Sequence, residues 1–95
     1  GRDREAIAIL DAELAGVPGN SSDIDKTRAD LAALLAGSGE HQRAQVLIDQ
    51  ALAAQRVRAG DEALGTVLLA AQRGEILIAA GAYAEAETAL REVLP

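Results

Sequence analysis

Residues 81–95, GAYAEAETALREVLP, set the pattern that the rest of the chain follows. The first residue of this stretch is glycine, which can adopt a positive φ and so turn the chain. Ala86, Leu90 and Leu94 then recur at four-residue intervals, which places them on one side of a helix. Pro95 has no N–H group and cannot continue a helix. The stretch therefore predicts a turn, a short amphipathic helix and a stop.

The same spacing occurs twice earlier in the chain. Each copy has a glycine, an alanine five residues later, an aliphatic residue four further on, and a leucine after another four. The three copies are Gly1, Ala6, Leu10 and Leu14; Gly39, Ala44, Ile48 and Leu52; and Gly81, Ala86, Leu90 and Leu94. The small alanine allows close contact with the preceding helix, and the aliphatic residue fills the space beside it. We therefore interpret the chain as a repeat of one helical unit.

Apolar periodicity and helix-breaking residues divide the chain into five predicted helices. The helices are expected over residues 1–15, 22–36, 40–59, 61–80 and 82–94, with a loop over 16–21. Ser22 followed by Asp25 resembles a capping box, and Asp61 is the expected N-cap of the fourth helix. Small residues, Ala32 and Gly74, each stand seven positions before a turn glycine. Gly74 lies inside a helix, where it is tolerated if a neighbouring helix crosses there.

The composition favours packed helices and argues against several classes of partner. Apolar residues make up 49% of the chain, with no Phe, Trp, Met or Cys, so the core consists of Leu, Ile, Val and Ala. The net charge of -6, from 15 acidic and 9 basic residues, disfavours nucleic acid and anionic membrane surfaces. No apolar run approaches the roughly 18 residues that span a bilayer, and no signal peptide is visible. We expect a cytoplasmic chain with no nucleic-acid or membrane partner, excised from a larger bacterial protein.

With these glycine turns, the run Gly81-x-Tyr83-x-Glu85-Ala86 resembles the tetratricopeptide repeat, or TPR. The resemblance covers nearly the whole chain. The intervals between the glycines are 38 and 42 residues, longer than the usual TPR period of about 34, and the longer interval resembles the long-helix variant of kinesin light chains and bacterial signalling proteins. The sequence departs from the TPR pattern at Arg28 and Ala70, where a large aromatic residue is expected, and at Arg73, which replaces a leucine.

The resemblance implies an all-α fold, namely a TPR-like right-handed array of antiparallel helix pairs with five helices. Residues 1–95 would form a single domain, with 1–15 as the second helix of a partial repeat and 22–59 and 61–94 as two helix pairs. TPR arrays bind proteins, so the resemblance implies a non-catalytic scaffold for a protein or peptide partner, which includes further repeats of the same parent chain. The first helix of each pair lines a concave groove in this family. The corresponding candidate binding residues are Lys26, Ala29, Asp30, Ala33, Leu68, Ala71, Glu75 and Ile78.

Two other functions stay open as alternatives. The chain would also suit the regulatory or sensory region of a bacterial signalling protein, such as a transcription regulator or protein kinase, or a homo-oligomerisation module. Catalysis is disfavoured because His41 is the only histidine and no Cys exists, and because Asp23 and Asp25 stand at a helix start, where the helix dipole explains them. We expect no catalytic residue, no metal and no cofactor, and we interpret Tyr83 as packing in a turn.

Overall fold

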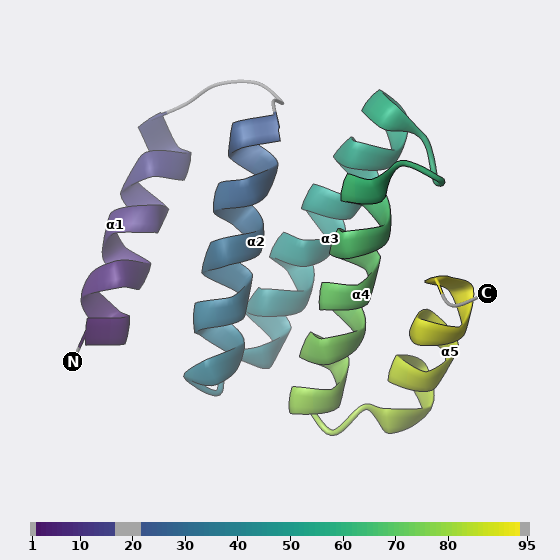
Figure 1. Cartoon of the computed structure of the whole chain (residues 1–95). Coiled ribbons are helices and arrows are strands. Elements are labelled where there is room, and N and C mark those ends of the chain that lie inside the picture. Colours follow the sequence, from purple (N-terminus) through teal and green to yellow (C-terminus); the bar gives the residue numbers. More distant parts are fainter. Residues whose placement is uncertain (1, 17–21, 94–95) are drawn as a thin grey trace.

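Five α-helices follow one another in the part of the chain that the computed structural model describes, residues 2–16 and 22–93 (Figure 1). Neighbouring helices pack antiparallel in chain order, and α3 lies behind α2 and α4. The molecule is thin, with extents of 37 × 30 × 16 Å. The helices are α1 (Arg2–Gly16), α2 (Ser22–Gly37), α3 (His41–Ala59), α4 (Leu64–Ala79) and α5 (Tyr83–Val93). The prediction of an all-α fold with five helices is confirmed.

The start of α4 differs from the prediction. This helix begins at Leu64, and the residue at its N-cap is Ala63, which makes no side-chain cap hydrogen bond. The turn before it is longer than expected because Gly60, at a φ of 88°, accepts a hydrogen bond of 2.7 Å from the Thr66 hydroxyl. Asp61 is therefore not the N-cap, and its carboxylate pairs with Arg56 at 3.3 Å. The predictions for Gly1, residues 17–21, Leu94 and Pro95 lie outside the described residues.

The two remaining turns have the same geometry. Gly39 and Gly81 take φ values of 87° and 79°, in the left-handed region that favours glycine. Each turn closes with two backbone hydrogen bonds, the Schellman arrangement that ends many helices. The matching bonds, 42 residues apart, are Gly39 N–H to Ala36 O (3.2 Å) with Gly81 N–H to Ile78 O (3.0 Å), and Glu40 N–H to Leu35 O (2.8 Å) with Ala82 N–H to Leu77 O (2.9 Å). The predicted turn glycines are confirmed at both positions.

The core is aliphatic and lies mainly between α2, α3 and the helices on either side. Side chains of α1, chiefly Ile7, Leu10 and Leu14, pack against it. A smaller cluster joins α4 to α5 through Leu77, Ala86 and Ala89. The buried residues of the larger cluster are Ala29, Leu31, Ala32, Leu35, Ala44, Ile48 and Ile76. Because aliphatic burial is the main source of stability, the α2–α3 pair is the centre of the fold.

The small residues of the repeat lie where helices approach each other. Ala44 and Ala86, the alanines of the second and third copies, are both buried, and so is Ala32. A Cβ atom added at Gly74 would lie 2.6 Å from Cδ2 of Leu90, so α5 packs directly on the glycine backbone. The prediction that a neighbouring helix crosses at Gly74 is confirmed.

Tyr83 does not pack in the turn, so that interpretation is wrong. It begins α5 and is 69% exposed. Ala82, one residue earlier, packs against the small α4–α5 cluster, which leaves the next side chain directed away from it. At the equivalent position of the first turn, His41 is half-buried, as expected for a residue at the start of a helix.

Candidate binding surfaces

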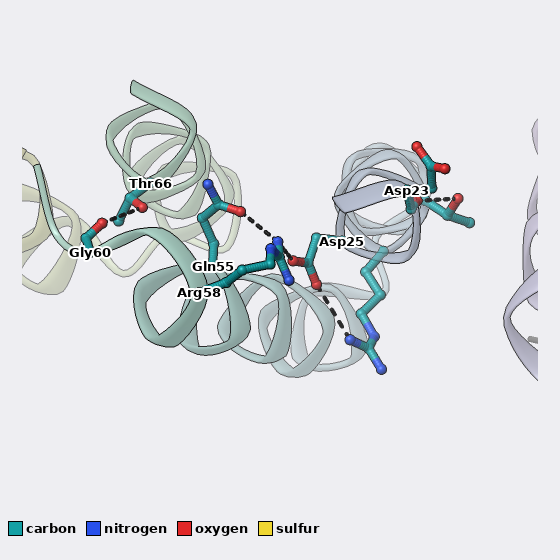
Figure 2. Close-up of polar contacts among 8 residues, drawn as sticks. Asp23, Asp25, Gln55, Arg58, Gly60 and Thr66 are labelled. Atoms are coloured by element: carbon teal, nitrogen blue, oxygen red, sulfur yellow. Dashed lines mark hydrogen bonds and ion pairs between the residues drawn. The ribbon is translucent and has the colours of Figure 1, made fainter. Parts of the chain in front are cut away.

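A buried carboxylate joins the N-terminal end of α2 to the C-terminal end of α3. Asp25 is 2% exposed, and its Oδ2 accepts a hydrogen bond from Nη2 of Arg58 (Figure 2). The same Arg58 nitrogen donates to Oε1 of Gln55 at 2.6 Å. Nη1 of Arg28, on α2 itself, lies 3.5 Å from Oδ1 of Asp25. One acidic side chain therefore holds two arginines that come from different helices.

Only part of this cluster can be predicted from the sequence. Asp25 was expected to serve the positive end of the α2 dipole, and Arg58 follows the preference for cations at a helix C-terminus. Antiparallel packing places the start of α2 beside the end of α3, which brings these two residues together across 33 positions. Oppositely charged residues at the facing ends of an antiparallel helix pair are the pattern that would have predicted the contact.

Both arginines that contact this carboxylate also line an open hollow of about 660 Å³, formed mostly by α3. We call it the arginine hollow. Its lining contains two cations, one amide and three apolar residues, and no acidic residue. The lining residues are Arg28, Gln50, Ala53, Ala54, Val57 and Arg58. A positive, partly apolar surface contrasts with a chain whose net charge is -6, and it is suited to an anion that carries an apolar group.

A second surface runs along α4. Five residues at alternating steps of four and three lie on one side of this helix, and four of them are apolar. Leu64, Leu68 and Ile78 are 73%, 60% and 44% exposed. We call this stripe the α4 face; its residues are Leu64, Leu68, Ala71, Glu75 and Ile78. Exposed apolar residues gathered on one side of a helix are typical of interaction surfaces.

The residues predicted to line a groove are divided between α2 and α4. On α2, Lys26, Asp30 and Ala33 are exposed, whereas Ala29 is buried and its carbonyl accepts a hydrogen bond of 2.7 Å from Nε2 of Gln72 on α4. The other four predicted residues, Leu68, Ala71, Glu75 and Ile78, all belong to the α4 face. Ala29 therefore contributes to contact between helices, and the binding role of the remaining residues stays a prediction.

Two exposed ion pairs connect the helices at other points. Arg43 on α3 donates to Asp11 on α1 at 2.5 Å, and Arg73 on α4 donates to Asp49 on α3 at 2.7 Å. The hydrogen bond that Arg43 donates to Asp11 raises the pKa of Arg43 above its ordinary value. Exposed ion pairs of this kind contribute little to stability.

Among the described residues, no group of three or more His, Asp or Glu side chains is placed to hold a metal ion. His41 has a buried Nδ1 without a hydrogen-bond partner in that part of the chain. None of the helices over 2–16 and 22–93 combines the length and apolar character needed to cross a bilayer. The candidate functional features of the described residues are two surfaces, the arginine hollow and the α4 face.

Comparison of the chain with protein-family models, curated proteins and solved structures gave no significant match. What is established is a small domain of five helices packed in sequence. The features of this domain that bear on function are the two surfaces and the internal repeat.

Proposed function

We propose that the chain is a TPR-like, non-catalytic protein-binding module whose α4 face docks an amphipathic helix of a partner. One observation carries the proposal. The stripe of α2 that corresponds to the α4 face is partly covered, with Ala29 buried and in contact with Gln72 of α4. The same stripe of α4 has no further first helix packed on it in the described part of the chain, and it exposes Leu64, Leu68 and Ile78.

The internal repeat supports the array interpretation. The turns at Gly39 and Gly81 share their hydrogen bonds, and both pairs place a small residue where the second helix crosses the first. The first helices of the two pairs also touch, as the Gln72–Ala29 hydrogen bond marks. In a stack of equivalent pairs, another helix can pack on α4 in the way that α4 packs on α2.

Charge indicates the kind of helix that would bind. The chain carries a net charge of -6, and Glu75 lies in the middle of the otherwise apolar α4 face. An amphipathic helix with leucines at helical spacing and a lysine or arginine near its centre would match both features.

The test is a titration of the isotope-labelled chain with a synthetic basic amphipathic helix, followed by amide NMR. The expected result is a set of shifts along α4, with none from a scrambled peptide of the same composition. Leu68→Glu should abolish binding, whereas Val46→Glu, which changes an exposed apolar residue on α3, should leave it intact. Equal shifts with the scrambled peptide, or no shifts on α4, would contradict the proposal.

Homo-oligomerisation is the second candidate, because an exposed apolar stripe also suits a second copy of the chain. Sedimentation of the chain alone over a wide concentration range distinguishes the two. Association that Leu68→Glu removes would favour a homo-oligomer, and a monomer at every concentration would eliminate it. A role as the regulatory region of a signalling protein also stays a proposal; a catalytic or DNA-binding domain encoded in the same gene would support it.

A further inference from the structure

A charged cluster interrupts the internal repeat in the α2–α3 pair. A shift of 42 residues takes Asp25 and Arg28 to Val67 and Ala70 of α4. Ala70 is buried and Val67 is half-buried, so the second pair fills these positions with apolar side chains. Helix packing therefore does not require a charge at either position. Since a buried ion pair is often no more stabilising than apolar residues of similar volume, stability alone does not explain the cluster.

The cluster has more hydrogen-bond donors than its own acceptors use. Nη2 of Arg58 donates to Asp25 and Gln55, while its Nε and Nη1 donate to no described residue. Arg28 approaches Oδ1 of Asp25 at 3.5 Å, and that buried oxygen accepts no hydrogen bond from the described part of the chain. Two guanidinium groups thus share one carboxylate, which leaves a net charge of about +1 with unused donors.

Arg28 and Arg58, the two arginines of the cluster, both line the arginine hollow. The planar guanidinium group pairs with planar oxyanions through parallel hydrogen bonds, with carboxylate as the closest match in shape. The rest of the wall is Ala53, Ala54 and Val57, with Gln50 as its one neutral polar residue. Such a wall accommodates an aliphatic chain of a few carbons attached to the anionic group.

We infer that the arginine hollow binds a small organic carboxylate with a short aliphatic chain. Arg28 and Arg58 hold the carboxylate, and the aliphatic chain packs on Ala54 and Val57. This site lies on α2 and α3, apart from the α4 face, so it does not depend on the proposed docking of a helix.

The test uses hexanoate as the probe, with hexanol and inorganic phosphate as comparisons, each titrated into the isotope-labelled chain and followed by amide NMR. Hexanoate should shift the amides of residues 53–58 and bind at least about tenfold more tightly than either comparison, because only it offers both a planar oxyanion and an apolar chain. Equal binding of hexanol would show apolar contact alone. Tighter binding of phosphate would show a bare anion site. Either outcome, or no shift with hexanoate, overturns the inference.

Three variants connect binding to these residues. Arg28→Ala copies the second helix pair, in which the buried Ala70 holds the equivalent position, so it should fold. It leaves Arg58 paired with Asp25, and it should lower hexanoate affinity by about tenfold or more. Val57 is 90% exposed, so Val57→Glu should leave the fold intact while its charge repels the carboxylate. Arg56→Gln is the matched control, because Arg56 pairs with Asp61 outside the hollow. Unchanged hexanoate affinity in folded Arg28→Ala or in Val57→Glu, or an equal loss in Arg56→Gln, would show that the hollow does not bind the carboxylate.

Discussion

The α2–α3 and α4–α5 pairs share a turn and a packing arrangement but differ in how many neighbours they have. The first pair lies between α1 and α4, and its Ile48 is fully buried. Within the described residues α5 packs only on α4, and Leu90, which corresponds to Ile48, is half-buried. Equivalent residues of a repeat therefore differ in energetic importance, because the neighbouring helices determine how much surface each one buries.

The largest difference is expected when the two equivalent aliphatic residues are shortened. Ile48→Ala should cost about 3–4 kcal/mol of unfolding free energy, because it opens a cavity in a fully enclosed site. Leu90→Ala should cost about 1.5–2 kcal/mol, since part of its side chain is already in water. Urea denaturation measures both values. Equal losses would show that α5 is covered as completely as α3, contrary to the comparison.

Enlarging the alanine of the second pair tests its close helix contact. Ala86 is buried against α4, so Ala86→Leu should overpack the site and lower stability by about 1–3 kcal/mol. Glu87→Leu adds a side chain of similar size at the neighbouring exposed position and should be nearly neutral. Thermal unfolding compares the two variants. A melting temperature of Ala86→Leu equal to that of the wild type would contradict the assigned packing.

A smaller effect is expected at Gly74. The first pair has Ala32 at the equivalent position, so the two pairs differ here by one methyl group. Alanine has a higher helix propensity, but its Cβ would meet Leu90 Cδ2 at 2.6 Å and Cγ at 2.8 Å. We expect Gly74→Ala to cost about 1 kcal/mol, because crowding outweighs propensity. In a Leu90→Ala background the same change should stabilise the protein. A double-mutant cycle measures this reversal, and additive effects would refute it.

Gly65 should respond in the opposite way within the same helix. A Cβ added there would lie 2.6 Å from Nε2 of Gln55, the far end of a flexible side chain that can move aside. Gly65→Ala should therefore stabilise the protein by roughly 0.5 kcal/mol through helix propensity alone. Chemical denaturation of the single variant measures the change. A loss of stability would show that Gln55 is fixed in place.

The sequence predicted what depends on local spacing. Glycines at repeated offsets predict the turns, and small residues such as Gly74 predict the helix crossing. In each case one short segment of the sequence contains the whole pattern. The sequence places the start of α4 too early because Asp61 has the side-chain chemistry of an N-cap residue. The Thr66–Gly60 hydrogen bond, which lengthens the turn, corresponds to no periodic pattern in the sequence.

The candidate surfaces were less predictable because they depend on which helices become neighbours. Ala29 and Ala71 occupy equivalent positions in the repeat, yet only Ala29 is buried. The next first helix, α4, covers this face of α2, and no described helix covers the equivalent face of α4 in the same way. The Asp25–Arg58 contact was missed for a different reason. The helix dipole gave each residue a sufficient local explanation, and nothing within either segment indicates a partner 33 positions away.

Packing in chain order also determines how the molecule opens. Because each helix meets its neighbour in the sequence, little loop entropy is lost when contacts form, and order can spread from the α2–α3 pair in both directions. The same arrangement lets α5 detach without disturbing the larger core. Hydrogen exchange should therefore be slowest in α2 and α3 and faster in the outer helices α1 and α5, in place of a single cooperative protection of the whole domain.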